Sequence, residues 1–210
     1  MSSLLLNNQS SNPGTPASGK VRLWTDSTTK QFKFTDDAGF HRGNLSNYST
    51  ASQAPSATVR TYITGTSIAV PVTKLQIGSC FRWSWSMTKT AAGTASSTID
   101  VAVGTAGTTA DTARVSFTKP AGTATVDEAM CSIIMVCRGP LTTAGILVGQ
   151  FALFHNLSAT GHATVPTVVL NTVSAGFDVT VANLILGVCL TSGASDAITI
   201  QIAQAEGWNL

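Results

Sequence analysis

Histidines are the residues of widest chemical use in this chain, and there are three: His41, His155 and His162. His155 and His162 are seven positions apart, on either side of the turn-rich segment 156–161, so they can face each other across a loop. A zinc site needs a third ligand at a fixed spacing and a second shell that orients the ligands, and Asp178 is the only acid nearby in the sequence. We therefore expect surface or edge histidines, with no metal and no cofactor.

Neighbouring acids are the second group that could do chemistry. Asp36 and Asp37 lie in a turn, where aspartate caps backbone N–H groups, and Asp127 and Glu128 come just before a strand. A glycosidase needs two convergent carboxyl groups, one with a raised pKa in a cleft, and nothing in the spacing singles out such a pair. The chain also lacks a G-x-S-x-G elbow and a phosphate-binding glycine loop. The sequence favours a protein that is not an enzyme.

Cysteines and tryptophans point to packing. The four cysteines have no CxxC spacing and lie in apolar runs, so we expect small buried side chains, although disulfides stay open. They are Cys80, Cys131, Cys137 and Cys189. Trp83 and Trp85 could stack on sugar rings if they faced solvent, but they share one side of a strand with Phe81 and Met87, which favours the core.

Composition indicates the elements that must carry these residues. Of 210 residues, 53 are Ser or Thr, Glu occurs only twice, and charged residues make up 10%. Thr suits a pleated, half-buried surface, whereas helices use Glu, Lys and Arg on theirs. With a net charge of +2 and a mean hydropathy of +0.24, the surface protects poorly against association, so we expect an oligomer. The Lys and Arg residues are scattered, which argues against nucleic acid.

Regular alternation begins near residue 58. Ile99, Val101 and Val103 alternate with other residues, as do Phe81, Trp83 and Trp85, and period two is typical of strands with one buried face. Turn residues separate most of the runs. The apolar or alternating runs are 58–63, 66–77, 80–88, 97–103, 112–118, 131–137, 146–154, 167–173, 181–190 and 197–204. This number of short strands predicts an all-β, jelly-roll-like antiparallel β-sandwich over residues 58–210.

Two runs are apolar throughout, 146–154 and 181–190. Strands covered on both faces have this pattern, and another subunit is a ready cover, for example in a trimer with sheets packed around a three-fold axis. An aromatic residue at an unperiodic C-terminus also tends to dock on something. The predicted oligomer interface is therefore Leu147, Phe151, Leu153, Leu184, Leu186 and Trp208.

The first 57 residues have no core of their own. Residues 1–19 are predicted to form an extended arm, 20–42 a β-hairpin that needs a surface to lie on, and 43–57 a polar linker. The run Leu4–Leu6 is too short for a signal peptide or a membrane span, so no membrane is expected. It could plug a partner's groove, or it could have no role. The hypothetical anchoring residues are Leu4, Leu5, Leu6, Val21, Leu23, Trp24, Phe32 and Phe34.

Several segments resemble a known group of proteins. GTPASGKVRLW at 14–24 and TKQFKFTDDAG at 29–39 resemble the N-terminal hairpin of structural proteins from tailed bacteriophages. The stretch 81–117, with its Gly/Thr-rich turns, and Phe154-His-Asn156 look like jelly-roll virion proteins of such phages. The likeness covers about 150 residues and includes no catalytic signature.

The resemblance implies a trimeric jelly roll on the virion surface, made in the host cytoplasm and attached by its N-terminal arm. Its partners would be other copies of itself and the major capsid protein or another virion protein. The implied role is a capsid decoration (cement) or head-fibre protein. The alternative is a tail fibre or receptor-binding protein that contacts a glycan or protein on the host surface. The short chain has no long shaft, which favours the capsid.

Overall fold

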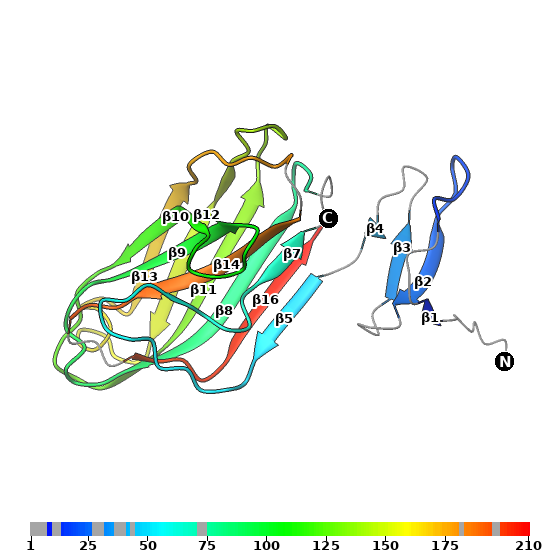
Figure 1. Cartoon of the computed structure of the whole chain (residues 1–210). Coiled ribbons are helices and arrows are strands. Elements are labelled where there is room, and N and C mark those ends of the chain that lie inside the picture. Colours follow the sequence, from blue (N-terminus) through cyan, green and yellow to red (C-terminus); the bar gives the residue numbers. More distant parts are fainter. Residues whose placement is uncertain are drawn as a thin grey trace, which may run out of the picture.

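The computed structural model describes residues 8–9, 14–26, 32–35, 41–42, 45–70, 75–180, 183–194 and 198–210, and every regular element in these ranges is a β-strand (Figure 1). Most of the strands form a sandwich of two sheets whose paired strands run antiparallel, so the predicted all-β antiparallel sandwich is confirmed. The predicted core position of Trp83 and Trp85 is confirmed as well, since both are fully buried.

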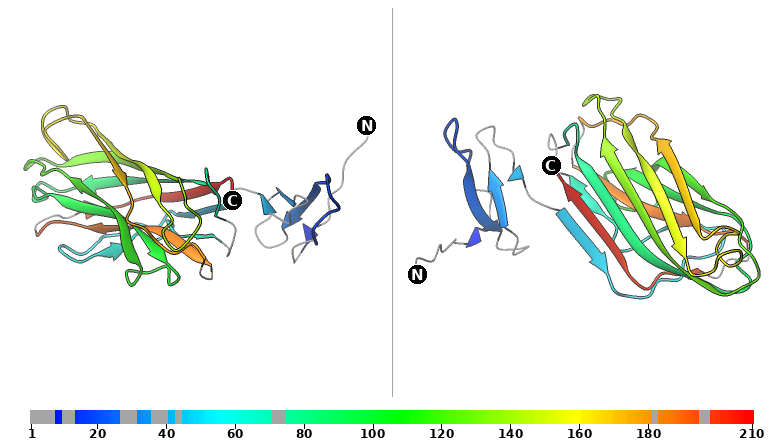
Figure 2. Two further views of the ribbon diagram at one scale, coloured as in Figure 1. Left: turned by 90° about the horizontal axis from the view of Figure 1, so that it is seen from above. Right: turned by 180° about the vertical axis from the view of Figure 1, so that it is seen from behind.

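The larger sheet has the strand order β13-β12-β11-β8-β16-β5, with β15 paired to β8 (Figure 2, right). Its strands are β5 (Leu45–Ser49), β8 (Cys80–Lys89), β11 (Asp127–Cys137), β12 (Leu147–His155), β13 (Thr167–Val173), β15 (Ile198–Thr199) and β16 (Ala203–Trp208). The smaller sheet has the order β10-β9-β14-β6, with β7 also paired to β14. Its strands are β6 (Thr61–Tyr62), β7 (Ile68–Val70), β9 (Ser97–Gly104), β10 (Thr112–Lys119) and β14 (Leu184–Thr191).

The chain crosses between the sheets in a nested way. Strands β9 and β10 form a hairpin in the smaller sheet, while β8 before them and β11 after them pair in the larger one. Such folded antiparallel connections are the building units of jelly rolls. They bring distant residues together: Ile133 pairs with Trp83 on one side and with Phe151 on the other.

Large aromatic side chains fill the space between the sheets. The ring of Trp85 stacks on Phe151 with 6.1 Å between centroids, and Phe151 lies 5.7 Å from Phe117 of the smaller sheet. The indole N–H of Trp83 donates to the carbonyl oxygen of Thr66 at 2.7 Å, which satisfies its polar atom. Burying each such ring stabilises the fold by roughly 2–3 kcal/mol.

Strand β5 corrects the predicted linker at 43–57. Leu45–Ser49 pairs antiparallel with β16 at the edge of the larger sheet. The amide of Asn47 also donates to the carbonyl oxygen and the hydroxyl of Ser67 at 3.0 and 2.8 Å. The segment Leu-Ser-Asn-Tyr-Ser has almost no apolar alternation, because an edge strand is held by backbone pairing and needs few buried side chains.

The N-terminal residues form a third sheet, with the order β1-β2-β3-β4 (Figure 1). Its strands are β1 (Asn8–Gln9), β2 (Arg22–Asp26), β3 (Phe32–Thr35) and β4 (His41–Arg42). Strands β2 and β3 pair antiparallel, and the indole N–H of Trp24 donates to the Thr35 hydroxyl at 3.1 Å. Among the described residues, this N-terminal sheet shares no strand pairing with the sandwich and adds no residue to its hydrophobic core.

Candidate functional site

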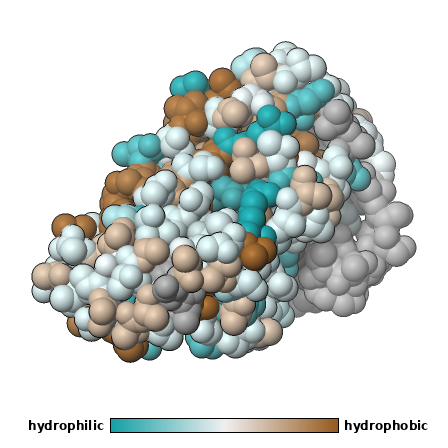
Figure 3. All heavy atoms as spheres, turned by 60° about the vertical axis from the view of Figure 1, so that its left-hand side comes forward, coloured by the Kyte–Doolittle hydropathy of each residue, from teal (hydrophilic) through white to brown (hydrophobic). Residues whose placement is uncertain are grey.

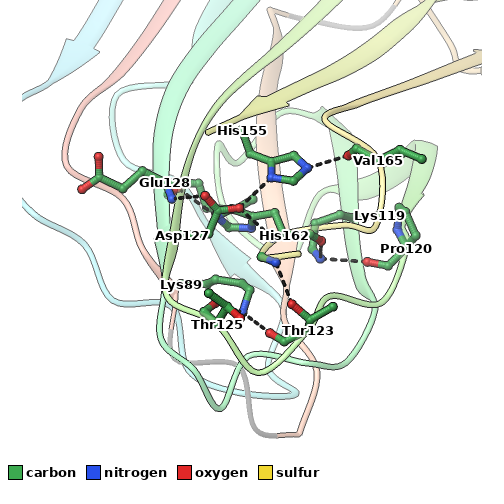
Figure 4. Close-up of polar contacts among 12 residues, drawn as sticks. Lys89, Lys119, Pro120, Thr123, Thr125, Asp127, Glu128, His155, His162 and Val165 are labelled. Atoms are coloured by element: carbon green, nitrogen blue, oxygen red, sulfur yellow. Dashed lines mark hydrogen bonds and ion pairs between the residues drawn. The ribbon is translucent and has the colours of Figure 1, made fainter. Parts of the chain in front are cut away.

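A buried polar cluster lies at one end of the sandwich (Figure 4). Asp127 begins β11 and His155 ends β12, and the Nδ1 atom of His155 lies 2.6 Å from Oδ2 of Asp127. Its Nε2 atom lies 2.5 Å from the carbonyl oxygen of Val165. Both ring nitrogens thus lie within hydrogen-bond distance of an internal oxygen atom.

His162 lies beside this pair, and its ring centroid is 6.2 Å from that of His155. Its backbone N–H donates to Asp127 at 2.9 Å, and its ring nitrogen Nε2 lies 3.1 Å from the carbonyl oxygen of Met87. Among the described residues, no atom accepts or donates a hydrogen bond at its buried Nδ1. Burial, with Lys119 nearby, lowers the pKa of His162 to about 4, so the ring is neutral at pH 7.

Two buried lysines tie the surrounding loops together. The ammonium group of Lys89 donates to the carbonyl oxygens of Thr90, Thr123 and Thr125 at 2.7–3.1 Å. That of Lys119 donates to the carbonyl oxygens of Pro120 and His162, both at 2.8 Å. A buried ammonium is tolerated when its donors are all engaged, and here the engaged donors hold three loops at fixed positions.

The acidic and basic side chains of this cluster are engaged mainly with one another and with the backbone. The side chains of Asp127 and His155 are buried, and each is occupied by internal partners. Glu128 points the opposite way, as alternation along a strand requires, so the two acids do not converge (Figure 4). In the described part of the chain, no three His, Cys, Asp or Glu residues gather closely enough to hold a metal. The contacts of this cluster tie together the loops at this end of the sandwich.

The sequence placed the two histidines partly correctly. His155 and His162 do face each other across a loop, but they are buried, which corrects the expected surface position. Their acidic partner is Asp127, 28 positions before His155, and not Asp178, which is exposed in a turn of its own. Only the pairing of β11 with β12 brings Asp127 to His155, and spacing along the chain could not indicate it.

The second candidate is the outer face of β11, β12 and β13, called here the outer band. Its outward positions fall in four cross-strand rows and none of them carries a charge. They are Met130, Ser132, Ile134 and Val136 on β11, Val148, Gln150, Ala152 and Phe154 on β12, and Thr167, Val169, Asn171 and Val173 on β13. Six apolar side chains among them (Met130, Ile134, Val136, Phe154, Val169 and Val173) are 37–52% exposed. Together they expose on the order of 500 Å² of apolar surface, near the upper end for the largest patch of a monomer.

The burial of five predicted residues corrects the predicted oligomer interface. Leu147, Phe151, Leu153, Leu184 and Leu186 are at most 5% exposed and lie in the core between the two sheets, so one chain already covers them. In a run that is apolar throughout, alternation does not tell which side faces inward, and the residues between the predicted ones on β12 face out instead. Strand β14 is buried on both faces, as expected, but its own chain covers it: the Tyr62 ring packs against Gly187.

Trp208 lies on the outer face of the larger sheet, in the same cross-strand row as Val136 of the outer band, with Cys80 of β8 between them. The guanidinium of Arg82 lies 5.8 Å from its ring centroid and forms an ion pair with Glu206. Tyr48, on the neighbouring strand β5, is 72% exposed. The place of Trp208 in an oligomer interface stays a prediction, and the two aromatic residues flank a charged pair.

The predicted anchoring residues divide into four groups. Val21 and Leu23 are 59% and 47% exposed, whereas Trp24 is buried. Phe34 pairs with Leu23 across the hairpin and is half-buried. Leu4, Leu5, Leu6 and the side chain of Phe32 lie outside the described residues, as do Asp36 and Asp37.

Exposed apolar side chains also lie elsewhere on the sandwich, among them Ile77, Val126 and Ile202. Figure 3 shows one face on which hydrophobic residues, in brown, stand in small separate groups among pale and polar ones.

The thiols of Cys131, Cys137 and Cys189 are buried and unpaired, and burial raises the pKa of each. No helix in the described ranges has the length and apolar character needed to cross a membrane.

Comparisons with known proteins give no family. No protein-family model matches the chain, and no curated protein matches it significantly. A solved protein of unknown function from Shewanella oneidensis MR-1 is 9% identical at a TM-score of 0.36, over 92% of this chain and 77% of that one. The CBM2 module of an evolved Dit from Lactobacillus casei BL23 phage J-1 is 9% identical at a TM-score of 0.30, over 95% and 84%. Likenesses this weak do not bear on function.

Proposed function

We propose that the chain is a structural protein of a bacteriophage virion, a capsid decoration or head-fibre protein, and that it has no catalytic activity. It associates with other copies of itself and is held on the virion surface by its N-terminal sheet, which docks on the major capsid protein or another virion protein. The resemblance of segments 14–24 and 29–39 to phage hairpins supports this role.

One observation carries the proposal: the apolar side of the β2–β3 hairpin has nothing to cover it among the described residues. Val21 and Leu23 are about half exposed, and they lie in a sheet that shares no core with the sandwich. A small sheet of this kind is marginal in water and gains stability when its apolar side is buried. A virion surface would supply that cover.

The prediction is that changing these two residues removes binding to the particle. We expect the double variant Val21→Ser, Leu23→Ser to lose at least about 10-fold in affinity, since each buried side chain contributes roughly 1.5 kcal/mol or more. Purified variant and wild-type chains are mixed with phage particles that lack the protein, and the bound fraction is measured by sedimentation.

Val59→Ser is the matched control, because Val59 is equally exposed on the sandwich. Unchanged binding of the double variant, with the control also unchanged, would refute anchoring by the hairpin.

The alternative role is a tail-fibre or receptor-binding protein that contacts a host glycan or protein. Exposed Tyr48 and the ring of Trp208 beside Arg82 support it, because flat aromatic surfaces next to charged groups suit such ligands. Tyr48 and Trp208 lie on the neighbouring strands β5 and β16 at one edge of the larger sheet. Carrying out the sedimentation with host cells in place of particles separates the two roles.

A further inference from the structure

We propose that the outer band is a two-fold interface, on which a second copy of this chain packs face to face with its strands running in the opposite direction. The inference deepens the proposed self-association and rests on it, but it is independent of where the N-terminal sheet docks. Three features of the outer band support it: its lack of charge, the charges at its two ends, and the sizes of its side chains.

Because the outer band carries no charge, a partner surface that is also uncharged can cover it without burying an unpaired charge. The four rows of the outer band carry only apolar or neutral polar side chains, and the nearest charges on the same face are Glu128 at the start of β11 and Arg82 on β8, opposite Ile134. Charges are depleted from the centres of protein interfaces because burying one without a partner is costly. A second outer band has the same composition. With its polar positions included, each band approaches the about 800 Å² per partner of a standard interface.

The charges at the ends fix the direction of packing. Glu128 at the start of β11 and Arg138 just after its end are exposed, and neither side chain has a hydrogen bond or ion pair recorded among the described residues. Consider a two-fold axis that lies between the two copies, perpendicular to the strands and at the level of Ile133. It places Glu128 of each copy over Arg138 of the other, once at each end of the interface. An axis along the strands would instead place like charges together.

The same axis matches large side chains with small ones. It lays the row of Met130 and Phe154 over the row of Val136, Val148 and Val173 of the second copy, since the rows are about 20 Å apart on the same strands. A shallow hollow of about 520 Å³ lies at the valine row, and one of about 560 Å³ lies between Met130, Phe154 and the neighbouring strand β8. The bulky row of each copy therefore meets the hollow of the other, and two sheets packed in this way are typically about 10 Å apart.

The test is the mass of the full chain in solution, measured by light scattering as a function of concentration. We expect a dimer, or a higher oligomer built from dimers, at about 50 µM, well above the Kd expected for an interface of this size. Phe154→Lys should raise the dimer Kd on the order of 100-fold, because it buries two unpaired charges. Val59→Lys, at an equally exposed site outside the outer band, should leave the Kd unchanged.

A charge exchange provides the sharper readout. Glu128→Arg alone, or Arg138→Glu alone, places like charges opposite each other at both ends and should raise the Kd about 10-fold. The double variant restores opposite charges and should recover wild-type affinity. Both sites are exposed, so the melting temperature should not change.

Three results would overturn the proposal: a monomer at that concentration, a trimer, or a double variant that stays weakened. A trimer would place the contact elsewhere and leave the virion role standing, because particle binding is measured separately through the hairpin variants.

Discussion

At the scale of single residues, the buried cluster makes stability depend on pH. The pKa of His162 is about 4 in the folded chain, compared with an ordinary value of 6.5, because burial and Lys119 oppose a positive ring while Asp127 favours one only partly. The unfolded chain therefore binds a proton at a higher pH than the folded chain does. The stability that depends on the neutral ring is complete above pH 6.5 and falls as the pH drops toward 4.

We expect the free energy of unfolding to fall by about 3 kcal/mol between pH 6.5 and pH 4 through this residue alone. Urea unfolding at several pH values measures it. In His162→Gln the same interval should be nearly flat, and an equally steep fall in that variant would assign the effect to other groups. Burial opposes a low pKa at Asp127, but its hydrogen bonds lower the pKa below the ordinary value of 3.8. The stability that depends on this carboxylate is therefore lost only as the pH falls below 3.8.

At the scale of elements, the pairing of β11 with β12 leaves no room for a side chain at Gly149. A Cβ atom there would overlap the carbonyl oxygen of Ile134 and press on the sulfur of Met135, and a paired backbone cannot move aside. We expect Gly149→Ala to lower the free energy of unfolding by about 3 kcal/mol. Gly176→Ala is the matched control, because its Cβ would meet Ala144 only at ordinary contact distance. Equal stability of the two variants would contradict the predicted overlap.

Most of the sandwich strands could be predicted, and the reason is alternation. The expected run 80–88 is β8 at Cys80–Lys89, and 97–103 is β9 at Ser97–Gly104, because large apolar side chains occupy every second position of each strand. Edge strand β5 was not predicted. It is held by backbone hydrogen bonds to β16, and its side chains show little apolar alternation. The β7 region was expected as one long run, 66–77, whereas the described strand is Ile68–Val70.

The candidate sites were less predictable because they depend on pairing between distant segments. The inward direction of Phe151 follows from its contacts with Trp85 and Phe117, and sequence alternation alone could not distinguish it from outward Phe154. The partnership of Asp127 with His155 arises from the register of two strands. The outer band likewise appears only when three strands are aligned.

At the scale of the whole molecule, the chain has one large core and a small sheet outside it. The core includes residues from both layers of the sandwich but none from β1–β4 among the described residues, and within the small sheet the buried Trp24 donates a hydrogen bond to Thr35. Local stability follows buried apolar contact. We therefore expect backbone amides of β2 and β3 to exchange with solvent at least about 100-fold faster than those of β8 and β11 in the free chain.

Hydrogen exchange with mass spectrometry measures this difference in exchange rate. Particle binding should make the difference smaller, because it slows exchange in β2 and β3 alone. Trp24→Ala should leave the melting temperature of the sandwich unchanged, whereas Trp83→Ala removes a fully buried ring and should lower its stability by about 3–5 kcal/mol. If β2 and β3 were as protected as β8 in the free chain, the small sheet would belong to the same cooperative unit. The small sheet would then already be stable without the virion, and docking would not be needed to cover its apolar side. In that case the sandwich would be the better candidate for the surface that binds the virion.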